Sequence, residues 1–268
     1  GVTNIASGAF ALCEGLTGVE IPNTVTSISE FAFEGCYGLT NLTIPSSVKN
    51  INHKAFAGCE NLDVVIRNAE EDVTVGSYAF DDCKSVTWKI IDESESPLKF
   101  NVLTETTAEV TDENCVEGSV TIPSKVVIDG KTYSVVSIAD NAFKNCKDLT
   151  GITIPSSVVK IGTGAFQGSG LTTIELPSSI TSFGYAVFKS CSFLVSVKIP
   201  SSVESIGESA FADCTSLTNL ELSSNVKIIG VMAFSGCENL DLVIDNSEDN
   251  VDVRPQAFQN CKSVTWKK

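Results

Sequence analysis

Apolar and polar residues alternate along this chain in a unit of about 23 residues that recurs ten times. Residues 33–56 show it most clearly, as F-x-x-C-x-x-L-x-x-L-x-I-P-x-x-V-x-x-I-x-x-x-A-F. The segment L-x-x-L-x-I has the apolar alternation of a short strand. The Pro and Ser residues that follow end this strand and turn the chain. Phe and Cys stand three positions apart, which predicts a single helical turn with both side chains on one face.

Each unit is therefore predicted to form one coil of a solenoid. A coil of ~23 residues cannot bury its own apolar face, so the coils must stack on one another. Stacking at the ~4.8 Å spacing of neighbouring strands places equivalent side chains in columns along the interior. The predicted fold class is a β-rich α/β solenoid in which short parallel strands alternate with single helical turns.

Two columns recur in nearly every unit and form the expected structural ladder. The phenylalanine column comprises Phe10, Phe33, Phe56, Phe80, Phe143, Phe166, Phe188, Phe211, Phe234 and Phe258. The cysteine column, three residues further on, comprises Cys13, Cys36, Cys59, Cys83, Cys146, Cys191, Cys214, Cys237 and Cys261. Ser169 alone interrupts the second row, and Cys115 alone lies outside it.

The cysteines are open to three interpretations. Ten cysteines in an exported protein suggest disulfides. Here, however, one cysteine recurs per coil where a small buried apolar residue is needed, and a free cysteine behaves as such a residue. Ser169 fills the same position, which indicates that size matters there more than pairing. We expect buried free thiols, with one or two disulfides as the alternative. A metal site is disfavoured because the chain has no C-x-x-C.

The repeats fall into two modules. Residues 58–90 and 236–268 are near copies, and both end in C-K-S-V-T-W-K. This pattern predicts a first module at 1–91, with four repeats and a truncated N-terminal end, and a charged linker at 92–97. The second module, 98–268, is expected to open with a β-hairpin cap at about 98–118, built from strands 98–104 and 107–111. A cap is needed because a terminal coil otherwise exposes its core, and six repeats follow it.

Composition and charge exclude several functions. The formal net charge of −15 argues against nucleic acid and anionic membrane surfaces as partners. No apolar run reaches the ~18 residues of a membrane helix, so membrane insertion is not expected. The single histidine, His53, leaves little general-base chemistry near neutral pH and no histidine-rich metal site. No G-x-S-x-G motif marks a hydrolase. The sequence therefore predicts a monomer that is not an enzyme and has no cofactor, metal or catalytic residue.

Candidate binding residues come from the positions expected to point outward from the strands. One such position is the residue two after the first Leu of each strand. It is small or polar in most coils and becomes apolar in the last two coils of each module. The resulting clusters are Val64, Ile66 and Trp88 in the first module, and Leu242, Ile244 and Trp266 in the second. They can be a hot spot for a ligand, because buried Trp side chains dominate many interfaces. Alternatively, both tryptophans are covered by neighbouring structure.

Acidic turns at 70–72 and 245–252 replace the usual Pro-Ser-Ser corner near the end of each module. Their carboxylates could hold calcium, but they lack the D-x-D-x-D-G loop and its distal Glu. We expect solvated turns.

The repeat unit resembles the BspA-like leucine-rich repeat of surface proteins from host-associated bacteria, whose signature is I-P-x-S-V-x-x-I-G-x-x-A-F-x-x-C. Residues 199–214 read I-P-S-S-V-E-S-I-G-E-S-A-F-A-D-C, and the resemblance covers roughly 1–90 and 98–268. It implies a right-handed leucine-rich repeat solenoid at the cell surface or secreted from it. It also implies adhesion, with a host or matrix protein or a glycan as partner. The alternative is a spacer that holds another domain away from the cell and has no ligand of its own.

Overall fold

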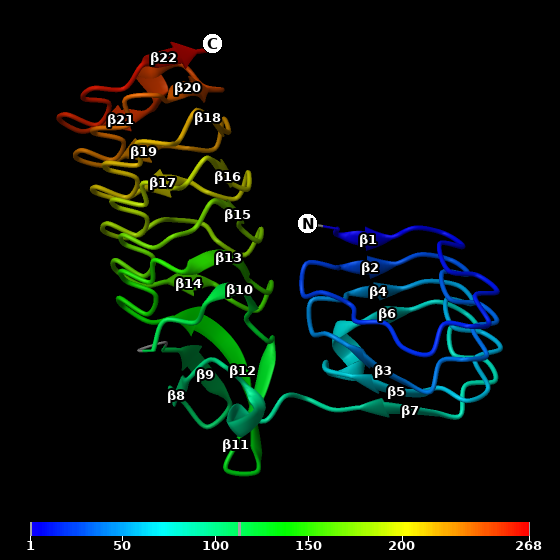
Figure 1. Ribbon diagram of the computed structural model, residues 1–268. Helices are drawn as coiled ribbons and strands as arrows, with labels where there is room; N and C mark the ends of the chain where they lie inside the picture. The colour runs from blue at the N-terminus through cyan, green and yellow to red at the C-terminus, as the bar shows by residue number, and fades with distance from the viewer. Residues whose placement is uncertain (1, 112–113, 268) are drawn as a thin grey trace. The chain divides into compact units, whose positions relative to one another are not determined.

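The computed structural model describes residues 2–111 and 114–267. The chain is a β-solenoid of about 11 turns with nearly no helix. It divides into two compact units, the first formed by Gly1–Glu95 with Lys125–Thr132 and the second by Ser96–Ser124 with Tyr133–Lys268. Each unit is a stack of coils (Figure 1), and the two are described separately.

Unit 1 has two parallel sheets in which each strand pairs with its equivalent in the next coil. The first sheet has the order β1 (Asn4–Ile5), β2 (Ser27–Ile28), β4 (Asn50–Ile51) and β6 (Thr74–Val75). The second has the order β3 (Asn41–Ile44), β5 (Asp63–Ile66) and β7 (Ser85–Trp88). The short helix η1 (Glu70–Asp72) stands in the acidic turn, and η2 (Glu93–Glu95) follows β7. Strand β11 (Lys125–Ile128) belongs to this unit, where Val127 N donates to Ile91 O at 2.9 Å.

Unit 2 repeats this arrangement, with its two sets of strands on opposite sides of the stack (Figure 1). On one side lie the pairs β10 (Gly118–Thr121) with β13 (Leu149–Thr153) and β15 (Thr173–Glu175) with β16 (Ser196–Lys198), followed by the sheet β18 (Asn219–Leu222), β20 (Asp241–Ile244) and β22 (Ser263–Trp266). On the other side lie β12 (Lys131–Ile138), which pairs with β14 (Lys160–Ile161), and the sheet β17 (Ser205–Ile206), β19 (Ile228–Ile229) and β21 (Asp252–Val253). The helix η3 (Glu248–Asn250) stands in the second acidic turn.

A hairpin opens unit 2. Strand β8 (Phe100–Val102) pairs antiparallel with β9 (Thr107–Val110), and β9 pairs in parallel with β12. The hairpin strands are shorter than the segments proposed from sequence. That this hairpin caps the solenoid stays a prediction, as do the module boundaries at 91 and 98.

The expected helical turn at A-F-x-x-C is not formed, so the α/β description gives way to a β-solenoid. Residues 31–35 are a series of tight turns in which Glu34 N donates to Phe31 O at 3.1 Å. The amides of Phe31, Phe33 and Gly35 donate to carbonyl oxygens of the next coil, as Phe33 N does to Ala55 O at 2.7 Å. An α-helix would direct these amides to carbonyls four residues earlier in the same coil. Because these amides donate to carbonyl oxygens of the next coil, they cannot form the hydrogen bonds of a helix, and no helix forms.

The turns require an unusual backbone. In each of the ten coils, the residues two before and two after the column phenylalanine have positive φ, for example Phe31 at 57° and Gly35 at 68°. Side chains other than glycine rarely adopt this left-handed conformation. Its recurrence in every coil shows that the stacked geometry, rather than local preference, determines it.

The column phenylalanines stack with their rings nearly parallel in two series. In unit 1 the ring centroids of Phe10, Phe33, Phe56 and Phe80 are 5.0 to 5.6 Å apart. In unit 2 the series from Phe143 to Phe258 has separations of 5.2 to 6.3 Å. The inner rings are fully buried, whereas Phe10 at the start of the first series is 36% exposed.

The cysteine column is hydrogen-bonded, and six of its nine members are buried, whereas Cys83 and Cys261 are half-buried and the expectation of burial is wrong at the exposed Cys13. Seven thiols donate to the carbonyl oxygen of the column phenylalanine one coil earlier, at 2.9 to 3.4 Å. The same oxygen accepts the amide of its own coil's cysteine, as Phe188 O does from Cys191 N at 3.1 Å. Burial raises the pKa of the Cys59 thiol to about 11 and that of Cys83 and Cys261 to about 12. These thiols are protonated and act as small donors inside the stack.

The expectation that all column cysteines are free thiols is wrong at Cys146, which forms a disulfide with Cys115. The other eight cysteines are free. Cys115 lies 31 residues before Cys146, whereas the usual spacing is 22 to 24 residues. The separation is longer because strands β11 and β12, at residues 125–138, are inserted between the two cysteines. This insertion hides the relationship between the two residues from a search for the repeat period.

Candidate functional site

Four of the six proposed binding residues do not point outward. Val64, Ile66, Leu242 and Ile244 are each 0% exposed and belong to the core. In β5 the buried residues Val64 and Ile66 alternate with the half-buried Asp63 and Val65. The proposed apolar cluster on the outer face is therefore wrong for these four residues.

A one-residue difference in the segment that leads into the strand explains the error. Two residues separate Leu39 from Leu42, but only one separates Leu62 from Val64. The strands nevertheless pair Leu42 with Val64, so the shorter segment before β5 shifts its alternation by one position. A one-residue shift exchanges the inner and outer faces of a strand. Unit 2 has the same shortening, since Leu220 pairs with Leu242.

The two tryptophans stand in the same inward columns, in the last strand of each sheet. Trp88 pairs with Ile66, and Trp266 pairs with Ile244. Both are half-buried, and the Trp266 ring lies edge-on to Phe258 with centroids 6.5 Å apart. Their place in these inward columns accounts for their partial burial, and no ligand is needed to explain it. A binding role for the two tryptophans stays a prediction.

The residues that do point outward from the long strands are mostly polar. In unit 1 they are Asn41, Thr43, Asp63, Val65, Ser85 and Thr87. In unit 2 they include Thr173, Glu175, Ser196, Lys198, Asn219, Glu221, Asp241, Val243, Ser263 and Thr265. Charges on this face are paired between neighbouring coils, as Lys198 is with Glu175. Beside this pair lies an open depression of about 540 Å³, lined in part by Lys198, Glu221 and Asp245.

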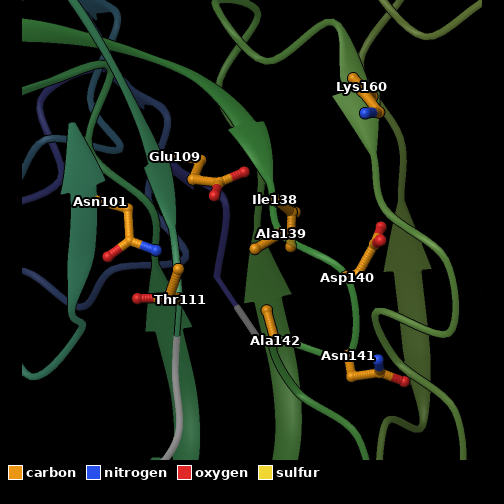
Figure 2. A pocket seen from close by; sticks show the side chains of 9 residues that line it. All are labelled: Asn101, Glu109, Thr111, Ile138, Ala139, Asp140, Asn141, Ala142 and Lys160. Atoms are coloured by element: carbon orange, nitrogen blue, oxygen red, sulfur yellow. The ribbon is translucent and has the colours of Figure 1, made fainter. Parts of the chain in front are cut away.

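A second hollow, which we call the polar recess, lies at the start of unit 2 and has a volume of about 500 Å³ (Figure 2). Its side chains come from the hairpin, from the turn after β12 and from β14. Six of them are polar: Asn101, Glu109, Thr111, Asp140, Asn141 and Lys160. The apolar residues Ile138, Ala139 and Ala142 complete its lining.

Strand register positions the charged groups of the polar recess. Ser137 of β12 pairs with Glu109 of β9 on one side and with Lys160 of β14 on the other. Glu109 and Lys160 therefore lie in one row across three strands, with the small Ser137 between them. In a sheet, residues of one row project from the same face. The Cα atoms of Glu109 and Lys160 are thus about two strand spacings, ~10 Å, apart.

The turn after β12 supplies two more polar groups. Asp140 Oδ1 accepts the amide of Thr163 from the next coil at 2.7 Å, which fixes the carboxylate. Asn141 has φ of 59° and follows directly, so the left-handed turn orients its side chain. Figure 2 shows Asp140 and Asn141 on the strip of chain between β12 and β14. The recess thus holds two carboxylates, two amides, a hydroxyl and an ammonium group on a backbone fixed by stacking.

This set of groups suits a ligand rich in hydroxyls. Carboxylates accept hydrogen bonds, ammonium groups donate them, and amides do both. The repeat does not reveal the recess, because three of its six polar residues come from the hairpin segment, outside the repeat. The only available signal is the polar alternation at 101, 109 and 111, and it predicts hairpin strands rather than a site.

The acidic turns are tied to basic side chains. Glu71 forms an ion pair with Lys125, and this contact lowers the pKa of the Glu71 carboxyl. Over residues 2–111 and 114–267, no group of three or more His, Cys, Asp or Glu side chains is arranged to hold a metal ion. Within the same residues, no helix is long and apolar enough to cross a membrane.

Comparisons with known proteins agree with this architecture. The family model for the BspA type leucine-rich repeat region matches residues 1–109 and 136–265, with six copies. Among solved structures, a leucine rich cell surface protein from Faecalibacterium prausnitzii A2-165 is 30% identical, with a TM-score of 0.50, over 93% of this chain. The chain spans only 59% of the length of that protein. The T. pallidum leucine-rich repeat protein TpLRR is 26% identical, with a TM-score of 0.53, over 63% of this chain and 88% of its own. No curated protein matches.

Proposed function

The chain belongs to the BspA-type leucine-rich repeat family, and on that premise we propose that it is a non-catalytic binding module at a bacterial cell surface, with a host or matrix protein or a glycan as its partner. Leucine-rich repeat solenoids are typically non-catalytic. A relative described as a cell surface protein supports the location.

The polar recess carries the proposal and favours a glycan over a protein surface. Its lining is dominated by groups that bind hydroxyls, with only small apolar residues and Ile138 between them. Protein hot spots, in contrast, are built on buried aromatic and Arg side chains, and the recess has neither. The two carboxylates outnumber the single Lys160, which favours neutral or amino sugars over acidic ones.

A screen of the soluble chain against a glycan array and immobilised matrix proteins tests this proposal. We expect binding to neutral or amino sugars, weakened by the Glu109→Gln variant. The Glu175→Gln variant is a matched control, because it changes a carboxylate on the long-strand face and leaves the polar recess intact. Loss in Glu175→Gln alone would place the site on the long-strand face. Absence of binding to every glycan and protein would reject a binding function.

A spacer is the second candidate, and one observation favours it. The outward rows of the long strands are nearly all polar, and both tryptophans stand in inward columns. Such a surface offers no aromatic anchor to a partner protein. In this case the full-length protein would retain binding after the polar recess is mutated, since another domain would carry the function.

A further inference from the structure

The cysteine column contains one interruption, and its position is informative. Nine of the ten positions three residues after the column phenylalanines are cysteine, and the tenth is Ser169. Ser169 is 1% exposed, so it occupies the same interior slot as the cysteines.

The disulfide lies in this column, although sequence spacing placed Cys115 outside it. Strand register aligns Gly118 with Leu149, and each residue stands three positions after its cysteine. The Cα atoms of Cys115 and Cys146 are 4.9 Å apart, close to the ~4.8 Å between stacked strands. Cys115 is therefore one coil before Cys146 in the stack.

Ser169 is one coil after Cys146. Gly170 N donates to Cys146 O at 2.9 Å, which places residue 169 beside the disulfide on the side away from Cys115. On its other side, Ser169 Oγ lies 3.5 Å from Cys191 Sγ. The side chains of Ser169 and Cys191 are thus in contact, and the order along the stack is Cys115, Cys146, Ser169, Cys191.

We propose that Ser169 insulates the Cys115–Cys146 disulfide from the free thiols further along the column. A thiol at position 169 would face the Cys146 sulfur opposite Cys115, in the line of attack for thiol–disulfide exchange. Its thiolate would form a bond to Cys146 Sγ while the bond between Cys146 and Cys115 breaks. The electron pair leaves on Cys115, which then takes up a proton, so the exchange needs no oxidant.

Repetition of this step would carry the disulfide along the stack. Cys191 could attack the new bond at position 169, and Cys214 could follow. The first step releases the segment that Cys115 holds against the coil of Cys146, and each later step moves the bond further from Cys115. The hydroxyl of Ser169 keeps the size and hydrogen bonding of the slot, but it cannot exchange with a disulfide.

Unit 1 provides the internal comparison. Its row of Cys13, Cys36, Cys59 and Cys83 is unbroken, and all four are free. The interruption occurs in the unit with the disulfide, directly beside it. A random loss of one cysteine would have no reason to fall there.

The Ser169→Cys variant tests the proposal, and it should fold because cysteine fills this slot in the other coils. Burial raises the pKa of column thiols such as Cys191, so the protein is incubated for a prolonged time without reductant at about pH 9.5 to raise the thiolate fraction. It is then alkylated and mapped by non-reducing peptide mass spectrometry. We expect a fraction of about a tenth or more with Cys146 linked to residue 169 and alkylated Cys115. The native sequence should retain only the Cys115–Cys146 link.

Two further variants make the outcome decisive. Ser156→Cys adds an exposed thiol outside the column and should leave the pairing unchanged. Ser169→Cys combined with Cys191→Ser should stop the exchange at residue 169, with no link further along. A folded Ser169→Cys protein that keeps Cys115–Cys146 as its sole disulfide after prolonged incubation would overturn the proposal.

Discussion

The thiol of Cys214 donates a hydrogen bond to the carbonyl oxygen of Phe188, one coil earlier, at 3.1 Å. This contact joins the two columns that define the repeat, and it explains why a cysteine rather than an alanine stands three residues after nine of the ten column phenylalanines. A thiol is small enough for the interior and still reaches the carbonyl.

Replacing Cys214 with Ala should lower the free energy of unfolding by about 1–2 kcal/mol, because a small void and an unpaired acceptor site replace the thiol. Cys214→Ser should cost less, since the hydroxyl preserves a donor. Cys13 holds the same repeat position but is exposed, so Cys13→Ala should change stability by less than about 0.5 kcal/mol. Urea unfolding of the three variants measures these differences. A neutral Cys214→Ala variant would contradict both the packing and the hydrogen-bond contribution of the thiol.

Gly170 should tolerate no side chain. A Cβ atom there would lie 1.8 Å from Lys147 O, a backbone atom that cannot move without breaking the stack. Gly170→Ala should therefore cost about 3 kcal/mol or more in unfolding free energy. Gly184→Ala is the control in the same unit, because its nearest neighbour, Ile161 O, would be at 3.8 Å. Similar melting temperatures for both variants would contradict the predicted packing of these coils.

A thiol titration in denaturant should detect eight free thiols without reductant and ten after reduction. Ten thiols before reduction would exclude the disulfide between Cys115 and Cys146. For a loop of 31 residues, reduction should destabilise unit 2 by about 3–4 kcal/mol, because the unfolded chain regains freedom. The Cys115→Ser variant should reproduce that loss and be insensitive to reductant.

Asp241 should contribute to the loss of stability in acid. It accepts hydrogen bonds from Lys262 at 2.5 Å and from Ser263 at 2.6 Å, and these contacts hold the pKa of its carboxyl below the usual value. Because the folded pKa is the lower one, its contribution is present above the unfolded pKa of about 4 and is lost as the pH falls through the folded pKa. Melting curves of Asp241→Asn should differ from the native protein at neutral pH and converge with it near about pH 2. A constant difference across that range would contradict this assignment.

The buried positions of the repeat unit could be predicted because each recurs in most of the ten copies. The phenylalanine stacking and the strands at L-x-x-L-x-I followed from that period, but the second set of short strands, such as β4, was not predicted. The helical turn at A-F-x-x-C was wrong because the deciding bonds, such as Phe33 N to Ala55 O, join different coils and leave no trace in a single unit. Local spacing cannot distinguish a helical turn from a stacked one.

The candidate site was harder to predict, for reasons of register and insertion. The segment before Val64 is one residue shorter than in the preceding coil, so residues expected on the outer face belong to the core. Only the pairing of Leu42 with Val64 reveals this shift. The polar recess joins Glu109 of the hairpin to Lys160 of a later strand, and no periodicity relates these residues. Sequence repeats therefore describe the scaffold and leave its surface undetermined.

The most direct test of the proposed function is a calorimetric titration of the best glycan from the array into the native chain and the Glu109→Gln variant. Loss of a charged hydrogen bond in the polar recess should weaken binding about 10- to 100-fold, whereas Glu175→Gln should bind as the native chain does. Unchanged affinity in Glu109→Gln would contradict the account, because the glycan would then bind elsewhere.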